Sequence, residues 1–125
     1  MSTIRLGLRE NRISFAPGEV IAGAVDWELQ AVPKKAEVRL GWTTVGKGTT
    51  DSQIVDRVVF QELRATDLRT FEFTAPAEPY SFSGKLVSLV WNVELVLQPK
   101  DLRERHEIVI APGGHEVLLP GVADA

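Results

Sequence analysis

Two stretches of this chain decide its fold: residues 15–25 (FAPGEVIAGAV), and residues 71–95, which contain FEFTAP, PYSFSGK and LVSLVWNVEL in that order. In each stretch, proline and glycine mark a turn, and a run of alternating apolar and polar residues lies beside it. Pro17-Gly18 suits a tight turn. Alternation with a period of two is typical of a strand that buries one face and exposes the other. Both stretches therefore predict long antiparallel strands.

The same alternation recurs along the rest of the chain. The faces that it predicts to be buried are Ile21, Gly23, Val25, Trp27 and Leu29; Ala36, Val38, Leu40 and Trp42; Phe71 and Phe73; Val87, Leu89, Trp91, Val93, Leu95 and Leu97; and Ile108 with Ile110. The run from Val87 to Leu97 is the longest apolar face, which predicts a central strand. Turn residues separate the runs, and several such strands without a convincing helix predict a β-sandwich.

One segment fits two patterns. In residues 51–63, the apolar positions match one face of a helix that Asp51 or Ser52 would cap. Strict alternation instead places Ile54, Val58 and Phe60 on one face, but it also places Asp56 there. Because valine, isoleucine and phenylalanine favour strands, the composition favours a strand over a helix.

Length and composition bound the class of protein. The 125 residues suggest one domain, expected to span residues 1–119 with a frayed tail at 120–125. There is no cysteine, which excludes disulfides, thiolate metal sites and cysteine catalysis. A net charge of −3 argues against a nucleic-acid partner. The sequence contains neither a signal peptide nor an integral membrane segment, so a cytoplasmic protein is expected.

At this point the residues resemble a known family. The pattern Phe15-x-Pro17-Gly18-Glu19-Val20-x-x-Gly23-x-Val25 is similar to the early strand-turn-strand of arrestin-like domains. The later stretch, Phe71-x-Phe73-x-x-Pro76, Pro79-x-Ser81, Gly84-Lys85-Leu86 and Val90-Trp91-x-Val93, resembles the central segment of the same family. The resemblance covers about half of the chain. It implies an all-β, immunoglobulin-like antiparallel sandwich of about seven to nine strands.

The resemblance also carries an expectation about function. Arrestins and the arrestin-like subunit of retromer generally act as adaptors that bind other proteins. This chain departs from arrestins in length, because 125 residues hold one sandwich rather than two in tandem. The interdomain charged switch of arrestins therefore cannot form within it. The resulting prediction is a non-enzymatic protein-interaction module with an unidentified protein partner, and self-association is a natural variant of that role.

Motifs for catalysis or cofactor binding are weak. Residues 41–48 (GWTTVGKG) miss the nucleotide-binding P-loop because Gly48 stands where a Ser or Thr hydroxyl would hold magnesium. His106 and His115 are the only histidines, too few and too far apart for a metal motif. No Gly-x-Ser-x-Gly elbow is present. We therefore assign no catalytic, cofactor-binding or metal-binding residue.

Partner contact is expected at loops. Tyr80 and Phe82 flank Ser81 in a segment bounded by Pro79 and Gly84, and Lys47 lies in a glycine-rich connection. These loops, or a strand added at an exposed sheet edge, are the predicted contact sites. Either the aromatic pair is exposed, or it folds back over the end of the sandwich.

The alternative function is a small-ligand or carbohydrate-binding sandwich, which would need an exposed tryptophan as a stacking platform. Trp27, Trp42 and Trp91 all lie on predicted apolar faces, which favours core positions.

Overall fold

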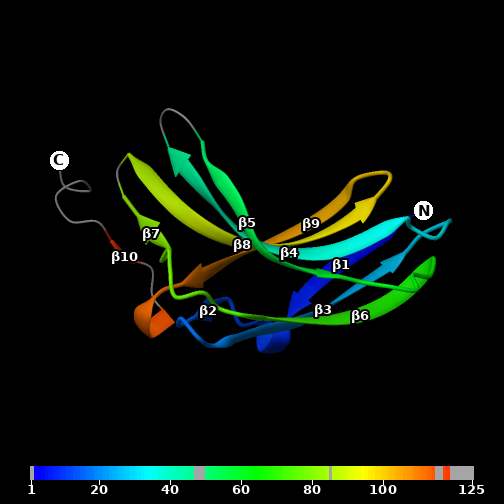
Figure 1. Ribbon diagram of the computed structural model, residues 1–125, viewed down its shortest axis with the longest axis horizontal. Helices are drawn as coiled ribbons and strands as arrows, with labels where there is room; N and C mark the ends of the chain where they lie inside the picture. The colour runs from blue at the N-terminus through cyan, green and yellow to red at the C-terminus, as the bar shows by residue number, and fades with distance from the viewer. Residues whose placement is uncertain (1, 47–49, 85, 115–116, 119–125) are drawn as a thin grey trace.

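The structure is a computed structural model that describes residues 2–46, 50–84, 86–114 and 117–118 (Figure 1). Its long strands are β1 (Thr3–Leu8), β3 (Val20–Glu28), β4 (Lys35–Gly46), β5 (Ser52–Val59), β6 (Thr66–Thr74), β8 (Val87–Gln98) and β9 (Leu102–Ile110). Three two-residue strands and two 3-10 helices accompany them: β2 (Ser14–Phe15), β7 (Phe82–Ser83), β10 (Val117–Leu118), η1 (Arg9–Asn11) and η2 (Pro112–Gly114). The predicted all-β class is confirmed. The predicted tail at 120–125 lies outside the described residues.

Two sheets face each other across the core. The smaller sheet has the order β1-β3-β6, and both of its pairings are antiparallel. In the larger sheet, β4 lies between β5 and β8, while β9 and β7 pair with different parts of the other edge of β8. The short strands β2 and β10 extend this sheet by parallel pairing with β9 and β7. Figure 1 shows the larger sheet bending at both ends so that its outer face, the one turned away from the smaller sheet, is concave.

The pairing of β4 with β8 is the centre of the larger sheet. It runs from Lys35 opposite Gln98 to Gly46 opposite Val87 without a register shift. The fully buried side chains of this pair between the sheets are Ala36, Val38, Leu40, Trp91, Val93, Leu95 and Leu97, whereas Val87, at the start of β8, is exposed although its alternation predicted burial. Each such aliphatic or aromatic side chain contributes about 1.5–3 kcal/mol when removed from water. The predicted central position of the β8 strand is confirmed.

The two stretches that suggested the fold contact each other. The Glu19 N–H donates to the Ala16 carbonyl at 3.1 Å, and Gly18 has φ 87°, which its lack of a side chain allows. Pro17 and Gly18 therefore occupy the positions that a type II turn requires. This turn carries the chain from β2 in the larger sheet to β3 in the smaller one. It docks on Ala75, whose carbonyl accepts from Gly18 N–H and whose N–H donates to the Glu19 carbonyl, both at 2.8 Å.

Residues 52–59 form a strand, so the favoured interpretation of that segment is confirmed. The strict alternation is wrong at one point, because the register with β4 shifts between Leu40 and Gly41 and leaves Val55 as an extra residue. The bulge turns Ile54 to the outer face, opposite Gly41, whereas Asp56 and Val58 share the inner face with Leu40 and Val38. Asp56 remains exposed because β5 is an edge strand.

β1 is absent from the strands predicted above, although Ile4, Leu6 and Leu8 alternate with polar residues and glycine. The strand pairs with β3 over its whole length, from Thr3 opposite Glu28 to Leu8 opposite Gly23. The alternation in residues 3–8 was therefore sufficient to predict it.

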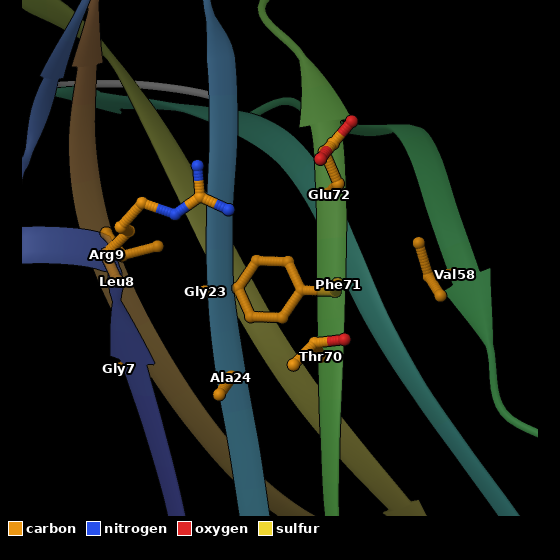
Figure 2. Close-up of a pocket in the computed structure, with 9 residues that line it drawn as sticks. All are labelled: Gly7, Leu8, Arg9, Gly23, Ala24, Val58, Thr70, Phe71 and Glu72. Carbon is orange, nitrogen blue, oxygen red and sulfur yellow. The ribbon is translucent and has the colours of Figure 1, made fainter.

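Gly23 sits at the centre of the smaller sheet because a neighbouring ring occupies the place of a side chain. Figure 2 shows the Phe71 ring reaching from β6 across Gly23 of β3, its direct partner in the pairing. A Cβ atom on Gly23 would lie 2.8 Å from Phe71 Cζ and would collide with the Gly7 carbonyl oxygen. The absence of a side chain at Gly23 thus makes room for Phe71, which is itself buried in the core.

We expect Gly23→Ala to destabilise the protein by roughly 1–3 kcal/mol, because the added methyl group must displace either the Phe71 ring or the β1 backbone. Urea unfolding followed by tryptophan fluorescence measures the loss. Gly7→Ala is the matched control, since a Cβ on Gly7 would meet no atom within 4 Å. Equal stability of the two variants would contradict this account of Gly23.

Candidate interaction surfaces

One end of the larger sheet exposes a group of large apolar side chains. We call it the apolar end, and it consists of Val45, Tyr80, Leu86 and Val87, of which Leu86 is 57% and Tyr80 41% exposed. The register explains why they gather: Gly46 lies opposite Val87, so the last residues of β4 and the first of β8 meet at this end. Along the strands, Val45 lies on the outer face and Val87 on the inner face, while Tyr80 precedes β7, which pairs with the start of β8. Exposed large apolar side chains at one end of a sheet can contact another molecule.

The aromatic pair that flanks Ser81 is divided by the structure. Tyr80 points to solvent, whereas Phe82 is partly buried and packs against the core. Of the two alternatives given above for this pair, exposure therefore applies to Tyr80 and folding back onto the sandwich applies to Phe82. Ser81, which lies between the two rings, is held in place by Ile110. Its N–H donates to the Ile110 carbonyl at 2.7 Å, and its Oγ accepts from the Ile110 N–H at 3.0 Å. Because this pair of bonds is buried, it anchors the segment that presents Tyr80.

Lys47, the third predicted contact residue, lies outside the described residues. Its described neighbour Gly46 ends β4 at the apolar end. The chain before and after the Lys47 connection is held by the Thr44 N–H, which donates to the Asp51 carbonyl at 2.8 Å, and by the Asp51 N–H, which donates to Thr44 Oγ1 at 2.9 Å.

The tryptophans are mainly core residues, as predicted. Trp27 and Trp91 are fully buried, and each indole N–H donates to a backbone carbonyl: Trp27 to Arg64 at 2.8 Å, and Trp91 to Pro79 at 2.9 Å. Trp42 is partly buried and packs against the core. Stacking of a sugar on Trp27 or Trp91 would require the core to open, which leaves Trp42 as the tryptophan with exposed surface.

The concave outer face of the larger sheet holds a buried carboxylate. Glu37 of β4 is only 1% exposed although it lies on the polar face predicted to be solvated. Arg39 Nη2 and Lys35 Nζ lie 3.1 and 3.4 Å from its Oε1, and Arg57 Nη1 lies 3.5 Å from its Oε2. Curvature of the sheet brings these long side chains together over the carboxylate, so that they replace water around it.

A second carboxylate lies across the same face. Glu94 of β8 is the direct neighbour of Arg39 in the β4–β8 register, and it accepts from Arg103 at 3.1 Å and from Arg105 at 3.2 Å. A groove of about 200 Å³ runs beside these groups, with Gln53 and Asn92 also in its lining. Arg39 Nε is buried there without a hydrogen-bond partner among the described residues. The face therefore holds an ionic network rather than isolated surface charges.

The cations lower the pKa of Glu37. Burial by itself would raise that pKa, because it disfavours the charged form. The hydrogen bonds and positive charges of Arg39 and Lys35 together outweigh burial, so that the pKa falls below its ordinary value. Glu37 is therefore ionised at neutral pH and holds the three cations around it.

Among the described residues, no group of three or more histidine, aspartate or glutamate side chains is arranged to hold a metal ion. The P-loop-like run begins within β4, and β5 rather than a helix follows it. His106 is partly buried in β9, while His115 lies outside the described residues. The hollow of about 690 Å³ in Figure 2 is lined mainly by small and apolar residues, with Arg9 and Glu72 as its charged groups.

No helix in the described part of the chain has the length and the apolar character needed to cross a lipid bilayer.

Comparison with solved structures identifies the fold. The structure is similar to Spo0M, a sporulation control protein from Bacillus subtilis, with a TM-score of 0.63 and 15% sequence identity over 88% of this chain. Spo0M has an arrestin-like fold, and the fold predicted from the sequence is confirmed. This chain spans about half of the length of Spo0M, since the match covers 49% of it.

The remaining comparisons add little. A β-glucosidase from Listeria innocua matches over 94% of this chain but only 16% of its own, with a TM-score of 0.47 and 15% identity. No protein family profile matches the chain, and no curated protein matches it.

The ionic network was not predicted from the sequence. Glu37, Arg39 and Glu94 occupy the alternate positions that indicate a solvated face, and nothing in their spacing shows that the sheet curls over them. One feature could have indicated that these charges are partly buried: β4 and β8 are both central strands, so residues on their outer faces have neighbours from a strand on each side.

We expect acidification to remove the stabilisation that Glu37 provides. Because its folded pKa lies below its unfolded pKa, this stability is fully present above the unfolded value of about 4.3 and is lost as pH falls through the folded value. Glu37→Gln should lower the free energy of unfolding at pH 7 by about 1–3 kcal/mol. It should also flatten the decline in stability below pH 5, measured by urea unfolding at a series of pH values.

Glu28→Gln is the control, because Glu28 is exposed and makes no ion pair with the described residues. A Glu37→Gln protein whose stability declines with pH as steeply as the wild type would show that Glu37 is not responsible.

Proposed function

We propose that this chain is a non-enzymatic protein-interaction module that binds a protein partner through its apolar end. The observation that carries the proposal is the exposure of four large apolar side chains, Val45, Tyr80, Leu86 and Val87, in the segments that meet where β4 ends and β8 begins. Protein interfaces are enriched in aromatic residues at their centre, and Tyr80 supplies such a residue. The likeness to Spo0M, whose name describes a control protein, is compatible with this role.

The framework around the apolar end suits a binding surface. Tyr80 is presented by a segment that Ser81 fixes to Ile110 and that Pro79 fixes to Trp91. Because these anchors are buried or partly buried, the ring would lose little conformational freedom on binding, which improves affinity. Lys47 and Phe82 belong to the same proposal: Lys47 as a charged group in the adjoining connection, and Phe82 as the partly buried neighbour of the contact.

We expect Tyr80→Ala and Leu86→Glu each to weaken partner binding at least tenfold while leaving the unfolding midpoint nearly unchanged. The measurement uses the purified chain as bait, identifies captured proteins by mass spectrometry, and then titrates the recovered partner against each variant by calorimetry.

Val32→Glu is the matched control, because Val32 is similarly exposed but lies in the loop before β4, at the opposite end of that strand from Val45. If Val32→Glu weakens binding as much as Leu86→Glu, or if both apolar-end variants bind normally, the apolar end is not the binding surface.

A further inference from the structure

The smaller sheet has one long edge without a strand partner among the described residues. β6 pairs with β3 on one side only. At the two ends of this pairing, the Leu29 N–H donates to the Ala65 carbonyl and the Ala75 N–H donates to the Glu19 carbonyl. Because hydrogen-bonded positions alternate along an antiparallel pair, the odd-numbered residues of β6 bond to β3. The backbone groups of the even-numbered residues, from Thr66 to Thr74, therefore point to the free edge. One of them, the Leu68 N–H, donates to Asp67 Oδ1 at 2.9 Å and would exchange this bond for one to an added strand.

The other long edges are less suited to accept a strand. β5 carries the bulge at Val55 and the inward-facing charge of Asp56, both of which oppose edge pairing. β1 lies against β9 of the larger sheet. β6 is different, since its nine residues pair with β3 in continuous register and contain neither proline nor lysine. Its inward-facing charges, Asp67 and Arg69, are of opposite sign and paired with each other, so that, unlike a single carboxylate, they can be complemented by a second copy.

The most exposed large apolar side chain also lies on this strand. Leu68 is 67% exposed on the outer face of β6, between Asp67 and Arg69 of the inner face. Asp67 and Arg69 are joined by an ion pair of 3.1 Å within one chain. When two copies of such a segment run antiparallel, the apolar residue can lie opposite its own copy, and each charged residue can lie opposite the residue of opposite charge.

Symmetry and charge select one register. If two β6 strands meet about a two-fold axis, one residue must lie opposite itself, and Asp67, Arg69 or Glu72 at that position would face its own charge. A centre at Thr70 would place Asp67 opposite Phe73. A centre at Leu68 instead places Leu68 opposite Leu68, Asp67 opposite Arg69, and Thr66 opposite Thr70. Every pair in this register is apolar, oppositely charged or hydroxyl to hydroxyl.

We propose that the chain forms a two-fold dimer in which β6 pairs antiparallel with β6 of a second copy, centred on Leu68. The two smaller sheets then become one continuous sheet with the order β1-β3-β6-β6-β3-β1. Each Asp67–Arg69 pair gains the opposite charges of the second copy as neighbours. The overlap is short, so the dimer is expected to dissociate on dilution, with a dissociation constant on the order of 10–100 μM.

Cysteine cross-linking tests the register, and the native chain contains no cysteine to interfere. Directly opposite residues of a hydrogen-bonded pair have Cα atoms about 5.5 Å apart, within the range that a disulfide spans. Leu68→Cys should therefore form a covalent dimer under mild oxidation at least tenfold faster than Leu86→Cys, which reports random collision. In the proposed register the two copies of Thr70 lie about 14 Å apart, so Thr70→Cys should react no faster than Leu86→Cys.

Faster cross-linking of Thr70→Cys than of Leu68→Cys would overturn the register. Rates for both variants equal to that of Leu86→Cys would overturn the dimer.

Sedimentation equilibrium from about 10 μM to 1 mM provides a second test without cysteine. The wild type should approach twice the chain mass of 13.8 kDa, and Leu68→Glu should remain a monomer with unchanged stability because the side chain is exposed. Tyr80→Ala should dimerise normally, which separates this proposal from partner binding at the apolar end. A wild-type protein that is monomeric throughout the range, or a Leu68→Glu variant that dimerises like it, would overturn the proposal.

Discussion

The pairing of β4 with β8 is the constraint on which the rest of the structure depends. A shift of this pairing by one residue would move Ala36, Val38 and Leu40 from the core to the outer face, so the hydrophobic effect fixes the register. The same register then determines three features elsewhere. It places Arg39 beside Glu94 on the outer face, brings the end of β4 against the start of β8 at the apolar end, and leaves β5 and β9 to flank the central pair.

The outer face of the central pair follows a different physical rule from the inner face. A carboxylate buried as deeply as Glu37 would be costly without nearby cations, because a buried charge loses its hydration. Three basic side chains from two strands supply the compensation. Since their aliphatic stems cover the sheet while their charged groups turn toward Glu37, the concave face is both covered and polar. This explains why an outward-facing residue can be less accessible than several core residues.

Much of the fold could be predicted from local sequence patterns, whereas the rest depends on strand register, sheet curvature and contacts between distant segments. Alternation located the inward faces around Trp27 and Trp91, and the Pro17-Gly18 turn was correctly predicted because turn geometry acts over a few residues. The bulge at Val55 could not be foreseen, since an extra residue is defined only against the partner strand. The burial of Glu37 depends on sheet curvature, and the division between Tyr80 and Phe82 depends on a contact of Ser81 with the distant Ile110. Those features arise from long-range pairing that the local pattern does not encode.

The separation along the chain of the two central strands has a consequence for folding. β4 can first pair with β5, its neighbour in sequence. The other edge of β4 stays unpaired until β8 has been synthesised and has docked against it. Sheets built from such distant segments fold slowly, in milliseconds to seconds, because loop closure precedes the stabilising contacts. During that interval the β4–β5 hairpin exposes Ala36, Val38 and Leu40 together with an unpaired backbone edge. The step most sensitive to aggregation is therefore the arrival of β8, and substitutions that delay it would reduce the yield of folded protein without altering its final structure.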